Sequence, residues 1–113
     1  MRTIIAGSRT GVTKHHLEDA LRLCNWTPTV VICGGAKGAD TLGKIWAEEN
    51  GIPVEMFPAD WELFGRKAGF IRNQDMARNA EALIALWDGT SKGTANMIEL
   101  ARKAGLATYV YLV

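Results

Sequence analysis

The chain has 113 residues, of which 48% are hydrophobic, and this suits one compact domain with one core. Its formal net charge of +1 gives the molecule no long-range attraction for a polyanion, which disfavours nonspecific nucleic-acid binding. No apolar run approaches the roughly 18 residues of a membrane span, and no basic-then-apolar leader opens the chain. We therefore expect an unprocessed cytoplasmic protein with no membrane partner.

Segments typical of strands and of helices alternate along the chain, as in a parallel sheet with crossover helices. The five predicted strands are mostly continuous apolar runs, which suit strands covered on both faces: Arg2 to Ala6, Thr29 to Cys33, Pro53 to Phe57, Ala82 to Trp87, and Ala107 to Leu112. The predicted fold class is α/β. We expect a single Rossmann-like domain over residues 1–113, with a mainly parallel five-stranded sheet and helices on both faces.

Four helices are predicted between these strands. The first lies behind a Thr13 N-cap, and its apolar residues recur at the spacing of one helix face: Leu17, Ala20, Leu21 and Cys24. The others are expected over three stretches: about Ala39 to Asn50, Lys67 to Asn79, and Thr94 to Ala104. The longest connection, Pro58 to Gly65, is rich in apolar residues, which predicts a flap folded over the domain rather than a mobile linker.

The cysteines and histidines give no sign of a disulfide or a metal site. Cys24 and Cys33 do not form a CxxC pair and fall in a predicted helix and a predicted strand, so reduced, packed thiols are expected. His15 and His16 are adjacent on a helix and therefore point in different directions, with no Cys or carboxylate at ligand spacing. We expect surface histidines and no metal.

Three glycine-containing turns each follow a predicted strand: Gly7-Ser8-Arg9-Thr10-Gly11, Gly34-Gly35-Ala36-Lys37-Gly38-Ala39-Asp40, and Asp88-Gly89-Thr90-Ser91-Lys92-Gly93-Thr94. In a parallel sheet they would open at one edge, where open α/β folds bind ligands. Backbone N–H groups and the positive end of a helix converge at such junctions and can hold an anion. Neither GxGxxG nor GxxxxGK[ST] is matched, so ATP hydrolysis by a P-loop mechanism is not expected.

Each turn residue also has a purely structural interpretation. Asp40 and Thr94 stand near predicted helix starts, where they would act as caps; alternatively, Asp40 accepts hydrogen bonds from ribose hydroxyls and Thr94 holds a phosphate. A cap is favoured for Asp40 taken alone. The convergence of three turns favours ligand binding, and the candidate residues are Gly7, Ser8, Arg9, Gly34, Gly35, Lys37, Gly38, Asp40, Arg72, Asn73, Asp88, Gly93 and Thr94.

Arg72 and Asn73 lie in the third predicted helix, whose apolar positions form no clean stripe. A half-buried Arg72 needs an anionic partner, either an internal carboxylate such as Asp75 or Asp60, or a ligand phosphate. Asn73 has the donors and acceptors to bind a base or a ribose.

Trp61 and Phe64 stand in the long connection before this helix. Large aromatic residues in such a segment more often form a minor core or an oligomer contact than a stacking platform for a nucleobase. The chain has four tryptophans, more than so small a core needs, so we expect a homo-oligomer, a dimer or larger.

These motifs in this order resemble the YspA, cpYpsA-related branch of the SLOG superfamily, and the resemblance spans nearly the whole chain: Gly7-Ser8-Arg9, the Gly34 to Asp40 turn, Phe57-Pro58-Ala59-Asp60-Trp61, Ile71-Arg72-Asn73, Trp87-Asp88-Gly89, and Ser91-Lys92-Gly93-Thr94. The resemblance implies a Rossmann-type sheet whose turns bind nucleotide-like or nucleotide-sugar ligands. Relatives in that superfamily include LOG phosphoribohydrolases, the DNA-processing protein DprA, and sensor domains for cyclic ADP-ribose-type signals. Members of this small branch occur in bacteria and their phages.

The sequence departs from the LOG hydrolases at one informative position. Their PGGxGTxxE signature ends in a catalytic Glu, and the position three residues after Thr94 is Met97, whose thioether cannot act as a carboxylate. Glu99 lies two positions further on, and at about 100° per residue it points away from the Met97 direction. The departure disfavours LOG-type hydrolysis and leaves Asp40 and Asp88 as weak catalytic candidates.

We therefore predict a protein that binds a small phosphorylated nucleoside or nucleotide sugar at the carboxyl edge of its sheet, with no further cofactor. One alternative is a ribosyl or phosphoribosyl hydrolase or transferase that uses Asp40 or Asp88. Another is a DprA-like module for single-stranded nucleic acid, which would need a basic groove built from Arg9, Lys37, Arg66, Lys67 and Arg72. The net charge argues against nucleic acid as a partner.

Overall fold

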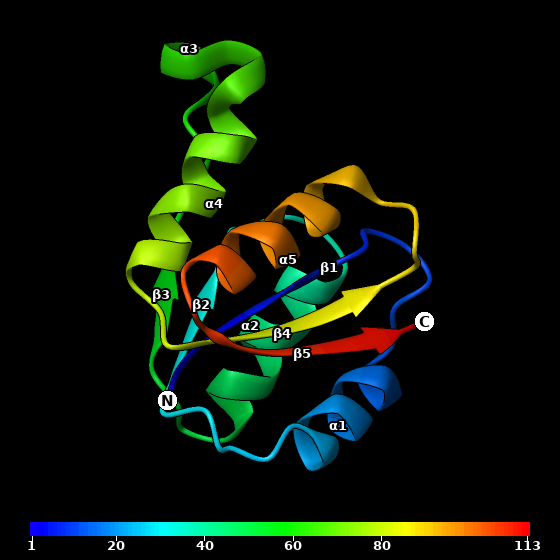
Figure 1. Cartoon of the computed structure of the whole chain (residues 1–113). Coiled ribbons are helices and arrows are strands. Elements are labelled where there is room, and N and C mark those ends of the chain that lie inside the picture. The colour runs from blue at the N-terminus through cyan, green and yellow to red at the C-terminus, as the bar shows by residue number, and fades with distance from the viewer.

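The computed structural model describes all residues, 1–113, and contains one five-stranded sheet (Figure 1). Its strands are β1 (Arg2–Gly7), β2 (Val30–Cys33), β3 (Val54–Met56), β4 (Ala82–Trp87) and β5 (Ala107–Leu112). Every neighbouring pair is parallel, in the order β3-β2-β1-β4-β5. The predicted α/β class, Rossmann-like arrangement and five strands are confirmed.

Four helices cover the two faces of this sheet: α1 (Lys14–Leu23), α2 (Ala39–Glu49), α4 (Ala68–Arg78) and α5 (Lys92–Lys103). A fifth, α3 (Trp61–Phe64), is a single short turn before α4. Successive strand residues point to opposite faces, so Ile4 packs with the side chains of α4 and α5, whereas Ile5 packs with those of α1 and α2. The result is a three-layer domain with one cluster of apolar side chains on each side of the sheet.

The helix starts confirm one expectation and correct two. Thr13 caps α1 as predicted: its hydroxyl accepts from the His16 amide at 3.3 Å, and the His16 ring accepts from the Thr13 amide at 3.1 Å. Asp40, however, is not the N-cap of α2, because that position is Gly38. Thr94 is not the start of α5 either, since the helix begins two residues earlier, after Ser91.

The segment before α4 does not fold over the domain as predicted. It forms α3 and a 3-10 turn, η1 (Gly65–Lys67), which continue directly into α4. Figure 1 shows α3 projecting beyond one end of α4, away from the sheet. The side chains of Trp61, Leu63 and Phe64 are 56%, 70% and 42% exposed, so they form no minor core.

Both cysteines are buried free thiols, and burial raises the pKa of Cys33 to about 12. No group of three or more His, Cys, Asp or Glu side chains is arranged to hold a metal ion. None of the helices combines the length and apolar character that crossing a membrane requires.

Candidate functional site

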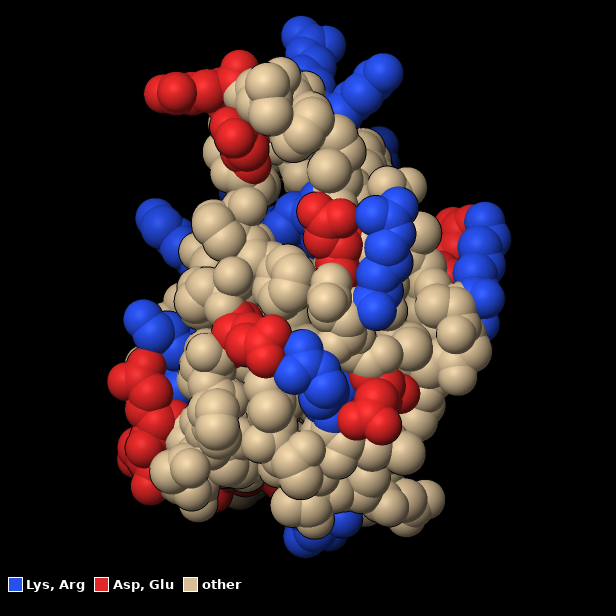
Figure 2. All heavy atoms as spheres, turned by 90° about the vertical axis from the view of Figure 1, so that its left-hand side faces the viewer, with Lys and Arg blue, Asp and Glu red and all other residues tan.

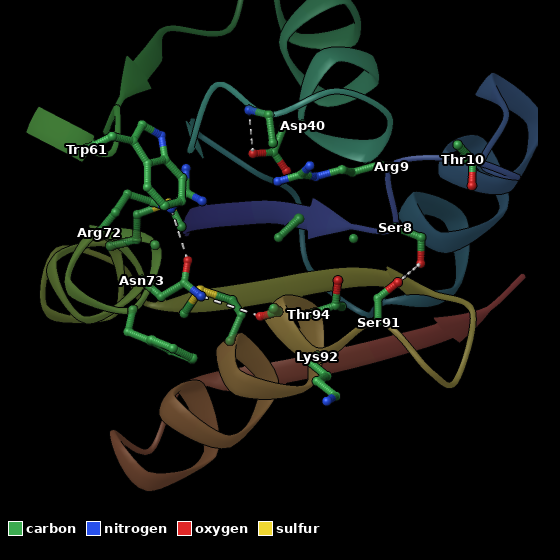
Figure 3. Close-up of a pocket in the computed structure, with 18 of the residues that line it drawn as sticks. Ser8, Arg9, Thr10, Asp40, Trp61, Arg72, Asn73, Ser91, Lys92 and Thr94 are labelled. Carbon is green, nitrogen blue, oxygen red and sulfur yellow. Dashed lines mark hydrogen bonds between the residues drawn. The ribbon is translucent and has the colours of Figure 1, made fainter. Parts of the chain in front are cut away.

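A cleft of about 480 Å³ lies at the carboxyl end of the central strands, bounded by the three turns and by α3 and α4 (Figure 3). Of the predicted site residues, these line it: Gly7, Ser8, Arg9, Asp40, Arg72, Asn73, Gly93 and Thr94. Five others do not: Gly34, Gly35, Lys37, Gly38 and Asp88. Arg66, predicted only for the basic groove of the nucleic-acid alternative, also lines the cleft. Four further lining residues were not among the predicted site residues: Thr10, Phe70, Ser91 and Lys92.

The first two turns are packed against each other by backbone contacts. The Ala39 amide donates to the Ser8 carbonyl oxygen at 3.3 Å. Gly38 has φ +78°, and a Cβ atom there would overlap this same carbonyl oxygen. A glycine is therefore required at position 38 on two grounds, its left-handed backbone and the close approach of the Ser8 turn.

The amides of the second turn already bind a carboxylate of the chain itself. Asp40 Oδ2 accepts from the Gly34 amide at 3.1 Å and from the Ala36 amide at 3.2 Å, and the residue is only 6% exposed. Burial raises the pKa of Asp40, and the hydrogen bonds from these amides and the nearby positive charges of Arg72 and Arg9 oppose that shift. Because Asp40 lies in the first turn of α2, a ligand anion at that helix end would meet a negative charge.

The N-terminus of α5 differs because its donors are unoccupied. The amides of Lys92, Gly93 and Thr94 have no partner in the protein; the first bonded amide of the helix is that of Ala95, which donates to the Ser91 carbonyl oxygen at 3.1 Å. The first turn contains no acidic residue. Unpaired amides and the positive end of the helix dipole together favour an anion at this position.

The Thr94 hydroxyl adds a further donor that no protein group uses. Thr94 is 6% exposed, and its hydroxyl has no hydrogen-bond partner in the protein. Every fully enclosed side-chain oxygen or nitrogen of the protein does have a partner, so the Thr94 hydroxyl oxygen is not fully enclosed. The Thr94 hydroxyl therefore opens into the cleft, as its orientation in Figure 3 also indicates.

Asp88 and Ser8 hold the third turn in shape. Asp88 Oδ1 accepts from the amides of Thr90 and Ser91 at 2.9 and 2.7 Å, and its Oδ2 accepts from the Ser91 hydroxyl at 2.8 Å. These bonds hold the pKa of Asp88 well below its usual value. The Asp88 amide in turn donates to the Ser8 hydroxyl at 3.0 Å, which ties the first turn to the third. Because Ser91 binds Asp88, its side chain does not cap α5.

Arg72 and Asn73 connect the second turn to the third through α4. Arg72 Nη1 donates to the Gly34 carbonyl oxygen at 2.5 Å, and Nε donates to Asn73 Oδ1 at 3.1 Å. Asn73 Nδ2 donates to Asn96 Oδ1 at 2.9 Å and to the Gly93 carbonyl oxygen at 3.4 Å. Since arginine has no acceptor, this chain of bonds fixes which way the Asn73 amide faces.

The carboxylates considered as partners for Arg72 are engaged elsewhere. Asp75 pairs with Arg78 at 3.2 Å, and Asp60 caps α3 by accepting from the Leu63 amide at 3.0 Å. Arg72 instead binds a backbone carbonyl and an amide side chain, so its positive charge has no carboxylate partner at ion-pair distance.

The cleft is more positive than the rest of the chain. Its lining has four cations and one carboxylate, Asp40, which leaves a local excess of +3; the cations are Arg9, Arg66, Arg72 and Lys92. None of the four is in a salt bridge. By contrast, Figure 2 shows acidic and basic side chains interspersed over the face that carries β3 and α4, without a continuous basic surface.

Met97 lies in the wall of the cleft and is 1% exposed, so a thioether stands where the LOG signature has its catalytic Glu. Glu99 lies outside the cleft and pairs with Lys103 at 2.9 Å, which confirms that it points away from the Met97 direction.

The comparisons with known proteins agree with this architecture. The family model described as YspA, cpYpsA-related SLOG family matches residues 1–64. Gene 61 protein of Mycobacterium phage D29 is 38% identical to this chain in an alignment of 114 residues, gaps included. The alignment covers 93% of this chain and 91% of that protein. The X-ray structure of DNA processing protein A (DprA) from Streptococcus pneumoniae has a similar fold, with a TM-score of 0.73 at 18% identity. That match covers 96% of this chain and 49% of DprA, so the chain spans about half of DprA's length. The chain belongs to the YspA, cpYpsA-related SLOG family.

Proposed function

We propose that this protein binds a small phosphorylated nucleoside or nucleotide sugar in the cleft, with a phosphate group at the N-terminus of α5. The observation that carries the proposal is the set of unpaired donors there, the amides of residues 92–94 and the nearly buried Thr94 hydroxyl. A phosphate oxygen accepts from such donors and gains from the helix dipole.

The charge and size of the cleft support the same class of ligand. Four cations without carboxylate partners surround a space of about 480 Å³, which is within the range of pockets for small ligands. A ligand with one or more phosphates would neutralise the excess of +3. Residues 1–113 would then act as a single nucleotide-binding domain.

Binding without hydrolysis is favoured over a ribosyl or phosphoribosyl hydrolase. Asp88 lies outside the cleft and has a lowered pKa, which makes it a weak base. Asp40 faces the cleft, but its Oδ2 atom is committed to two amides. The hydrolase alternative predicts release of free base from nucleoside monophosphates, lost in both aspartate variants.

A nucleic-acid module is the other alternative. The likeness to DprA supports it only at the level of the fold, and the candidate cations do not gather in one groove, since Lys37 and Lys67 do not line the cleft. This alternative predicts binding to single strands that weakens steeply with salt. The exposed apolar side chains of α3 support a homo-oligomer, which light scattering on the purified chain tests.

A panel of nucleotides tests the proposed function: the 5′-mono- and diphosphates of the four common ribonucleosides, and ADP-ribose, each added during thermal unfolding. A ligand at about 100 times its Kd stabilises the folded state by about 2.7 kcal/mol. We expect at least one compound to raise the melting temperature by several degrees and to give a saturable isotherm in titration calorimetry. Failure of every compound in both assays would overturn the proposal.

A further inference from the structure

We propose that Asp40 selects ribose over 2′-deoxyribose, by accepting a hydrogen bond from the 2′-hydroxyl of the nucleotide. This inference rests on the proposed function and adds to it the identity of the sugar.

The two oxygens of the Asp40 carboxylate differ in what they bind. Oδ2 accepts both amide bonds from the second turn, whereas Oδ1 has no hydrogen-bond partner in the protein. The residue is 6% exposed and lines the cleft. Since no side-chain oxygen is both fully enclosed and unpaired, Oδ1 is accessible from the cleft.

The cleft therefore presents an acceptor on one side and donors on the other. Figure 3 shows the Asp40 carboxylate across the cleft from Thr94, with the Arg9 guanidinium beside it. A phosphate is repelled by a carboxylate and belongs at the donors of α5. The group that meets Asp40 must donate, and the sugar hydroxyls of a nucleotide are its donors next to the phosphate.

The amide bonds to Oδ2 make this acceptor well suited to discriminate. They hold the carboxylate in one orientation, so a sugar hydroxyl meets a fixed oxygen rather than a mobile side chain. A 2′-deoxy ligand lacks the 2′-hydroxyl and would leave a nearly buried carboxylate oxygen without that donor, which costs more than the loss of an exposed hydrogen bond. We expect the ribonucleotide to bind at least about tenfold more tightly than its 2′-deoxy counterpart.

The test compares wild type with Asp40→Asn, using the nucleoside 5′-monophosphate that binds best and its 2′-deoxy form. The asparagine oxygen can accept from the Gly34 and Ala36 amides, while its NH₂ group replaces Oδ1 at the cleft. Calorimetric titration should give a clear preference for ribose in the wild type. In the variant we expect the ratio of the two Kd values to fall to within about threefold. Inorganic pyrophosphate, which lacks a sugar, should still bind the variant.

The outcomes separate this inference from the proposed function. If no nucleotide binds the wild type, the proposed function fails, and this inference fails with it. If nucleotides bind but both sugars bind the wild type equally, Asp40 does not select ribose, and the donor it meets is another group, such as the 3′-hydroxyl or a base amine. That wild-type ratio needs no folded variant. A preference that persists in Asp40→Asn would also overturn the assignment.

Discussion

Thr94→Val is the sharpest test of the anion site at α5, because it removes one hydroxyl and keeps the shape of the side chain. That hydroxyl has no partner in the protein, so we expect the free energy of unfolding of the unliganded chain to change by less than about 1 kcal/mol. A hydrogen bond to a charged phosphate contributes about 1.5–3 kcal/mol. The variant should therefore bind a phosphorylated ligand roughly 10- to 100-fold more weakly, while its unliganded stability stays within about 1 kcal/mol of wild type.

The matched control is Thr90→Val, which makes the same chemical change in the same turn at an exposed residue outside the cleft. Titration calorimetry with the tightest-binding nucleoside 5′-monophosphate gives the affinities, and urea unfolding gives the stabilities. Wild-type affinity in Thr94→Val, or an equal loss in Thr90→Val, would refute the reasoning.

Two further substitutions test the polar network around the cleft. Asn73→Asp would turn a carboxylate oxygen toward Asn96 Oδ1 and the Gly93 carbonyl oxygen, so we expect a loss of about 2 kcal/mol or more; an unchanged urea midpoint would contradict this. The pKa of Asp40 is higher in the folded state than in the unfolded state, so protonation of Asp40 stabilises the fold. This stabilisation is complete below the unfolded-state pKa of Asp40 and is lost as the pH rises through its folded-state pKa. Asp40→Asn should therefore be more stable than wild type at pH 7 in urea, and the difference should shrink toward about pH 4. A difference that widens in acid would show that the sign is wrong.

The sheet was readable from sequence because its strands are covered on both faces. Such strands are short continuous apolar runs between turn residues, and the bounds predicted for Ala82–Trp87 and Ala107–Leu112 match the structure. Strand β3 is shorter than predicted and covers only Val54–Met56.

The prediction for the segment before α4 is wrong because apolar residues in a connection do not by themselves indicate burial. Trp61, Leu63 and Phe64 lie in a short helix that projects from the domain, where the described chain offers them no core. The usable signal was local: Asp60 stands three residues before Leu63, whose amide it caps. Spacing of that kind predicts a helix start regardless of where the apolar side chains go.

The groups that bind the amides of the three turns could not be predicted. A glycine-rich turn specifies a backbone shape, but it does not specify whether a side chain of the protein or a ligand accepts from its amides. The second and third turns each carry an aspartate, Asp40 and Asp88, that accepts from amides of its own turn. The two aspartates differ in their position relative to the helix that follows. Asp88 precedes α5 and satisfies amides outside the helix, which leaves the helix end open to a ligand. Asp40 stands inside α2, and its negative charge disfavours a phosphate there while leaving one oxygen for a donor. One position within a turn thus decides whether the neighbouring helix end favours an anion or a hydroxyl.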